Sequence, residues 1–244
     1  MSFLHLTNAS AVAIACWALW VRRLSFGSRW DAPITVGVGL YGLAAALDSA
    51  WPAMAAASFP VTGKYYVLPA LGHICYLAGT AAGIRSVYVR LLPDEEIDAF
   101  MRTRVTPAVA IAGVAMLGCL IASPVTSAMP AEHLYTVPMD GWLRAYFVIF
   151  LLTFTGLLWA AVFGGFLLRK EPNSGAVLPL MGTASTGSIG CLVILAAILS
   201  GRTELVPTFV WPVTYLATAA ASLICGIYWR RRVASLTRPA DDSA

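Results

Sequence analysis

Charge is scarce in this 244-residue chain: only 11% of the residues are Asp, Glu, Lys or Arg, whereas 59% are hydrophobic. The mean hydropathy is +0.77. A soluble domain of this length needs far more polar surface than this composition provides. The shortage of charge therefore excludes an ordinary water-soluble domain and predicts a protein whose solvent is the lipid bilayer.

Lysine and histidine are also rare, and their positions exclude several chemistries. The last lysine is Lys170, so the seventh apolar stretch lacks the Schiff-base lysine that a retinal protein needs. Three scattered histidines provide no pair of axial haem ligands, and the sequence has neither a phosphate-binding loop nor a zinc-ligand cluster. We therefore expect no enzymatic activity, no metal, no cofactor and no nucleic-acid partner.

Cysteine is missing from the segments where oxidation would pair it. All five cysteines fall inside apolar stretches, which excludes a disulfide framework and predicts that they pack as small apolar side chains. They are Cys16, Cys75, Cys119, Cys191 and Cys225.

Long apolar stretches dominate what remains. A spanning helix needs about 20 apolar residues, and strands of a membrane barrel would instead alternate in polarity over about 10 residues. The sequence therefore predicts an all-α, seven-transmembrane helix bundle over residues 1–229, followed by a short basic-then-acidic cytoplasmic tail, 230–244. The expected spans are 3–21, 33–53, 66–89, 105–123, 142–168, 176–199 and 207–229.

The basic residues predict the orientation of this bundle. Of the 16 Lys and Arg residues, only Lys64, Arg144 and Arg202 fall on the side opposite the rest. Because basic loops stay in the cytoplasm, the N-terminus is expected outside and the C-terminus inside. Arg22 and Arg23 follow the first apolar stretch, the reverse of a cleavable signal, so we expect a retained helix in a multi-pass protein of the cell membrane.

The longest inner connector has an ordered charge pattern. Acidic residues begin the segment from Pro93 to Arg104 and basic residues end it, which complements a helix dipole. The pattern predicts a short interfacial helix. It serves either as a solvated connector or as a docking surface for a cytoplasmic partner protein.

Ionisable residues inside spans are costly and are the main functional signal. Asp48 and His73 lie near the outer ends of the second and third spans, where neighbouring helices allow a hydrogen bond between them. Tyr41 and Tyr76 share their helix faces. Two interpretations remain open: a structural clamp between helices, or an outward-facing ligand pocket or protonation switch.

A second polar stretch occupies the middle of the sixth span, from Gly182 to Gly190. Small residues allow helices to approach closely, and hydroxyl groups can bond across helices, so tight packing is one explanation. The other is a flexible pathway lined by the hydroxyl groups, placed beneath the Asp48 and His73 site. Its candidate ligand-binding residues are Thr183, Ser185, Thr186 and Ser188.

The segment from Asp140 to Phe150 (DGWLRAYFVIF) opens the fifth span. Together with the N-out layout, this segment resembles actinobacterial seven-helix membrane proteins that are labelled as transporters. Members of that group are similar to the seven-helix input regions of bacterial sensor kinases. The resemblance implies a polytopic bundle but no catalytic residues and no particular substrate.

Two functions are consistent with these patterns. The first three and the last three spans share an orientation around the fourth, as in parallel-repeat transporters. We therefore expect a small-molecule transporter with its ligand site in the outer half of the bundle. The alternative is a receptor-like sensor that signals through a separate cytoplasmic partner. In both cases the expected partners include the lipid bilayer and a small-molecule ligand.

Overall fold

The computed structural model describes residues 3–48, 57–128, 134–169, 176–202 and 215–236. Within these ranges every regular element is helical, which confirms the predicted all-α class. Residues 49–53 and 207–214 of the expected spans lie outside the described residues.

Seven helices of at least 16 residues form the described part of the bundle. They are α1 (Phe3–Arg22), α2 (Ala32–Leu47), α5 (Val67–Tyr88), α7 (Thr106–Ala122), α9 (Gly141–Leu168), α10 (Val177–Leu199) and α12 (Ala217–Leu236). Short elements connect them: η1 (Arg23–Gly27), α4 (Phe59–Thr62), α6 (Asp94–Phe100), η2 (Met101–Val105) and α8 (Val125–Ala128). Helix α12 continues past residue 229, into the segment that the sequence assigned to the tail.

Within the described residues, five helical segments are long and apolar enough to cross a membrane. They are Leu6–Gly27, Val67–Tyr88, Asp94–Ala122, Gly141–Leu168 and Val177–Leu199. Helix α2 is also apolar but has only 16 residues, and it ends at Leu47 with Asp48 as its C-cap. These helices are compatible with an integral membrane protein.

The connector that precedes α7 contains the predicted short helix. Helix α6 has Asp94, Glu95 and Glu96 in its first turn, where carboxylates interact favourably with the helix dipole. It runs through the π-helical turn η2 into α7. Asp98 of α6 pairs with Arg85 of α5 at 2.8 Å, which holds the connector against the bundle.

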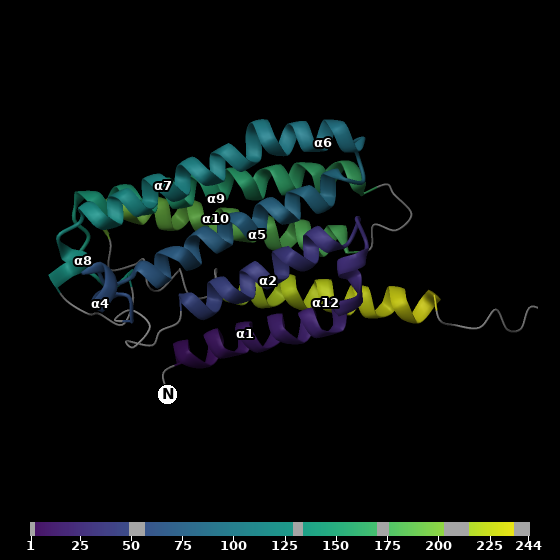
Figure 1. The fold of residues 1–244 in the computed structure, drawn as a ribbon, viewed down its shortest axis with the longest axis horizontal. Coiled ribbons are helices and arrows are strands. Elements are labelled where there is room, and N and C mark those ends of the chain that lie inside the picture. Colours follow the sequence, from purple (N-terminus) through teal and green to yellow (C-terminus); the bar gives the residue numbers. More distant parts are fainter. Residues whose placement is uncertain (1–2, 49–56, 129–133, 170–175, 203–214, 237–244) are drawn as a thin grey trace, which may run out of the picture.

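The long helices run side by side in a closed sequence around the bundle (Figure 1). Helix α1 packs between α2 and α12, and α2 packs on α5. Helix α5 also contacts α7 and α9, while α10 packs on both α9 and α12. Helices α2, α5, α9, α10 and α12 therefore surround the space in which the candidate site lies.

Glycines bring α2 and α5 into close contact. A Cβ atom on Gly37 of α2 would lie 3.0 Å from the carbonyl oxygen of Gly79 on α5. A Cβ atom on Gly72 would lie equally close to the carbonyl oxygen of Ala44. Such approach is possible only where side chains are missing, as in other closely packed membrane helices. It explains why the polar residues of α2 and α5 can meet.

A buried arginine fastens one end of the bundle. Arg22, at the end of α1, is only 2% exposed. Its Nε donates to Thr35 Oγ1 at 2.9 Å, and its Nη atoms donate to the carbonyl oxygens of Cys225 and Asp31, both at 3.2 Å. These bonds connect α1 with α2 and α12, because Asp31 and Thr35 lie at the start of α2 and Cys225 lies on α12.

Asp31 supplies negative charge beside this arginine. Its carboxylate also faces Arg90, after α5, at 3.5 Å and Arg232, on α12, at 3.4 Å. We call Arg22, Asp31, Arg90 and Arg232 the Arg22 cluster. It joins the ends of α1, α2, α5 and α12, because the buried Asp31 carboxylate pairs with Arg90 and Arg232 while Arg22 bonds the Asp31 carbonyl oxygen.

Candidate functional site

His73 lies at the centre of a buried aromatic cluster. The hydroxyl of Tyr146, on α9, is 2.7 Å from Nδ1, and the hydroxyl of Tyr135, in the segment before α9, is 2.6 Å from Nε2. The imidazole stacks on Phe150, with the ring centroids 4.5 Å apart. Both ring nitrogens are therefore satisfied, although His73 itself is fully buried.

Asp48 lies beside this cluster. Its Oδ2 atom is 3.9 Å from His73 Nε2 and 3.2 Å from the hydroxyl of Tyr215, which lies just before α12. The structure thus brings the two ionisable residues together, as the sequence predicted. It does not form the predicted hydrogen bond, because Tyr135 already occupies the nitrogen that faces Asp48.

A cavity of about 160 Å³ lies next to these groups, between α2, α5, α9, α10 and α12. An engineered apolar cavity of similar volume accommodates benzene, so the space is sufficient for a small ligand. Its lining on α9 extends from Phe150 to Gly165, which corresponds to about 22 Å along a helix. The cavity is therefore long and narrow, parallel to the helices.

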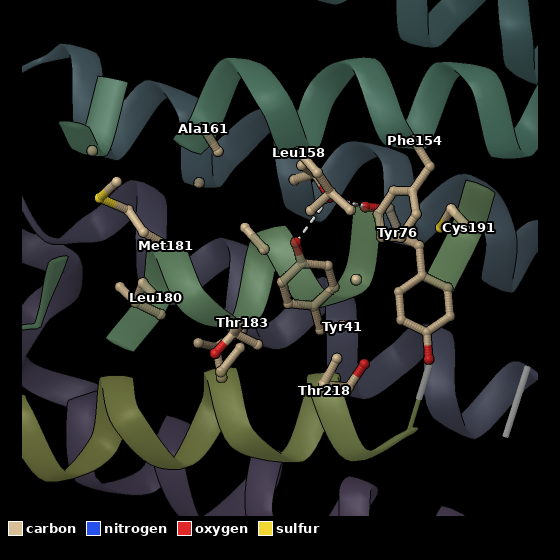
Figure 2. A pocket seen from close by; sticks show the side chains of 18 of the residues that line it. Tyr41, Tyr76, Phe154, Leu158, Ala161, Leu180, Met181, Thr183, Cys191 and Thr218 are labelled. Atoms are coloured by element: carbon tan, nitrogen blue, oxygen red, sulfur yellow. Dashed lines mark hydrogen bonds between the residues drawn. The ribbon is translucent and has the colours of Figure 1, made fainter. Parts of the chain in front are cut away.

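Most of the cavity wall is apolar (Figure 2). Among the described residues that line it, none is an Asp, Glu, Lys, Arg or His. Gly83 of α5 also belongs to the wall, and a Cβ atom placed there would find no described atom within 4 Å. This glycine therefore leaves open space, whereas Gly79 one turn earlier packs against α2.

The polar groups of the cavity gather toward the end nearer His73. Tyr41 and Thr80 are joined by a hydrogen bond of 2.8 Å, and the Thr80 hydroxyl donates to the carbonyl oxygen of Tyr76 at 2.9 Å. Because the threonine proton is thereby used, Tyr41 must be the donor in their bond. The hydroxyl of Tyr76 is buried and makes no hydrogen bond of normal geometry to any described residue, although Thr218 lies nearby.

The sequence-predicted site residues fall into three groups: those that line the cavity, those that lie behind its wall, and the hydroxyl residues of α10 that lie outside it. Tyr41, Tyr76 and Thr183 line the cavity, and Figure 2 shows them facing its interior from three helices. Asp48 and His73 lie outside the lining, behind Tyr135 and Phe150, which belong to both the cluster and the cavity wall.

The hydroxyl stretch of α10 is not assembled into a pathway. Thr183, Thr186 and Ser188 each donate to the carbonyl four residues earlier in their own helix. Ser185, Thr186 and Ser188 are absent from the cavity wall, and Thr186 is exposed on the outside of the bundle. Of this stretch, only Thr183 among the candidates faces the cavity.

Sequence reasoning missed the tyrosines that complete the His73 cluster. Tyr135 and Tyr215 lie in or beside connecting segments, where polarity alone does not distinguish a buried hydroxyl from an exposed one. Tyr146 falls inside the DGWLRAYFVIF segment. The position of this segment at a helix end is the signal that could have identified Tyr146. In the described part of the chain, no three His, Cys, Asp or Glu residues are grouped as metal ligands.

No protein-family model matches this chain, and no curated protein or solved structure matches it. Its function must therefore be inferred from the helices and from the chemistry of the cavity.

Proposed function

We propose that this protein is a receptor-like sensor of the cell membrane, with seven spans, its N-terminus outside and its C-terminus in the cytoplasm. It binds a small apolar molecule inside the helix bundle and signals through a separate cytoplasmic partner. The observation that carries this proposal is the elongated cavity between five helices, whose described wall contains no charged side chain. Apolar walls stabilise apolar ligands because binding removes ligand surface from water.

Uncharged walls favour sensing over transport. An apolar molecule without charge dissolves in the bilayer and crosses it unaided, so its passage needs no carrier. A protein that binds such a molecule within the membrane can instead report its concentration. The ligand then needs different affinities for two conformations of the bundle.

Helix α12 offers a route from the cavity to the cytoplasmic end. Thr218, Ala221 and Cys225 lie on its cavity face, and the carbonyl oxygen of Cys225 accepts a hydrogen bond from Arg22. Two turns further along, Arg232 pairs with Asp31. A ligand that shifts α12 would therefore alter the Arg22 cluster directly, at the end of the bundle where a partner protein would bind.

The buried pair of Asp48 and His73 supports a second candidate, a proton-linked small-molecule transporter. Ionisable residues inside membrane bundles commonly belong to proton or solute pathways. In this case the ligand site would lie in the outer half of the bundle, around the His73 cluster. The hydroxyl of Tyr135 and the ring of Phe150 would have to move before a solute could reach His73 from the cavity.

Binding to the cavity can be tested on the purified protein in phospholipid nanodiscs. The probe is a long-chain alkane with a photoreactive diazirine, and the readout is saturable labelling of peptides from α5 and α10. Gly83→Leu should abolish this labelling because its side chain extends into the open space beside Gly83. Gly156→Leu is the matched control, since Gly156 also has no described atom near its Cβ but faces outward on α9.

Sensing and transport predict different responses to the same probe. Spin labels at Leu24 and Arg231, both exposed and near the Arg22 cluster, should change their separation when the alkane saturates a sensor. Proteoliposomes containing a transporter should instead show proton movement that requires Asp48. Loss of saturable labelling in Gly156→Leu as well as Gly83→Leu, or equal labelling in both variants, would contradict binding in the cavity.

A further inference from the structure

In the described part of the cavity wall, the buried hydroxyl of Tyr76 has no hydrogen-bond partner. We infer that the ligand of the cavity is an uncharged single-chain molecule that carries one acceptor oxygen, as in an aliphatic ketone, aldehyde or alcohol. Tyr76 would donate a hydrogen bond to that oxygen. This inference rests on the proposed function and specifies the chemical class of its ligand.

The Tyr76 hydroxyl is a buried hydrogen-bond donor. Tyr76 is 1% exposed, its ring lies in the cavity wall, and its hydroxyl has no hydrogen-bond partner among the described residues. An unpaired buried hydroxyl is costly, and an acceptor on the ligand would remove that cost. Tyr41 cannot fulfil this role because its proton is used in the bond to Thr80.

Because the described residues of the cavity wall include no charged side chain, the ligand is expected to be uncharged. A carboxylate or an ammonium group in this cavity would be desolvated without a counter-charge, which is strongly unfavourable. Asp48 and His73 lie behind Tyr135 and outside the lining, and Arg22, which bonds the carbonyl oxygen of Cys225, is also outside it. A neutral oxygen, in contrast, needs only the hydrogen bond that Tyr76 can donate.

The position of Tyr76 also determines the orientation of the ligand. From Tyr76, the cavity face of α5 continues through Thr80 and Gly83 to Val87, about 16 Å along the helix. Beyond Thr80 this face is apolar, and Met181 and Val177 of α10 line the same end. The oxygen is therefore expected beside Tyr76, with the apolar chain extending toward the Arg22 cluster.

Three probes with the same number of carbons separate this inference from simple apolar binding: an alkane, a methyl ketone and a carboxylate. Each competes with the photoreactive alkane in nanodiscs, at concentrations corrected for its partition into the lipid. The ketone should compete about threefold to tenfold better than the alkane, the gain expected for one buried hydrogen bond. The carboxylate should compete worse than both.

Tyr76→Phe should abolish the advantage of the ketone and leave the alkane unchanged. Tyr65→Phe is the matched control, because Tyr65 stacks on Phe59 away from the cavity wall and should retain the advantage. A ketone labelled with ¹³C at its carbonyl should show a lowered stretching frequency in the wild type and not in Tyr76→Phe. This band reports the hydrogen bond itself and does not depend on stability.

The outcomes distinguish this inference from the function on which it rests. Saturable alkane binding with no preference for the ketone would overturn the acceptor-oxygen ligand and leave the apolar site intact. The same holds if Tyr76→Phe weakens ketone and alkane equally. No saturable competition by any probe would overturn both the ligand class and the proposed binding cavity.

Discussion

Alanine substitutions at three glycines should have opposite effects on stability if the packing between α2 and α5 is as described. At Gly37, the added Cβ atom would lie 3.0 Å from a backbone oxygen of α5, which cannot move without separating the helices. At Gly83, it would meet open space. Gly156 also has open space but faces outward, so it reports the effect of alanine on the helix alone.

The expected magnitudes follow from these environments. Replacing glycine by alanine inside a helix favours folding by up to about 1 kcal/mol, because alanine loses less backbone entropy. Gly83→Ala and Gly156→Ala should therefore be neutral or stabilising by similar amounts. Overpacking between well-fitted surfaces costs about 1 to 3 kcal/mol, so Gly37→Ala should lower the free energy of unfolding despite its better helix propensity.

The assay is reversible unfolding in mixed micelles, with helix content and tryptophan fluorescence followed together. Wild-type stability in Gly37→Ala would refute the close contact of α2 with α5. Destabilisation by Gly83→Ala, with Gly156→Ala unaffected, would show that the space beside Gly83 is filled by protein. Either result would remove a geometric basis of the proposed site.

Three further substitution experiments test other parts of the structure. Asp31→Asn should lower the free energy of unfolding by about 2 kcal/mol, since it removes the carboxylate that pairs with Arg90 and Arg232; an unchanged unfolding curve would contradict these pairs. In a double-mutant cycle, Asp48→Asn and His73→Gln should together cost less than the sum of their separate effects because they are 3.9 Å apart, and strict additivity would show that they do not interact. In a background without native cysteines, a cysteine at Ser127 should react with an impermeant thiol reagent in intact cells while one at Thr103 should not; the reverse pattern would invert the orientation.

Much of the fold could be predicted from the sequence, because helices in a bilayer must satisfy their own backbone hydrogen bonds and therefore leave long apolar stretches. The ends of α5, α9 and α10 agree with the expected spans to within about a residue. The boundary between bundle and tail was less predictable, since α12 continues through its arginines to Leu236. Charged residues end the apolar pattern but do not end a helix.

The candidate site was predicted only in part. Asp48 and His73 are conspicuous in the sequence because charged residues are scarce. Their positions on two consecutive helices were enough to predict that they lie side by side. The cavity could not be predicted in the same way, since its position depends on which glycine of α5 packs against α2 and which one leaves open space between the helices. Gly79 and Gly83 are alike in the sequence, but only Gly79 faces the backbone of α2. Serines and threonines at mid-helix likewise gave no sign that their protons bond within their own helix.

The claim of an apolar ligand site inside the bundle is tested most directly by locating the adducts of the photoreactive alkane on the wild-type protein in membranes. Saturable adducts are expected on Val87 and Met181, which line the cavity, and excess unlabelled alkane should suppress them. The outward-facing residues Ile111 and Val114 of α7 should be labelled without saturation, as expected for contact with lipid. Adducts confined to such outward-facing residues, with none in the cavity, would contradict an apolar ligand site inside the bundle.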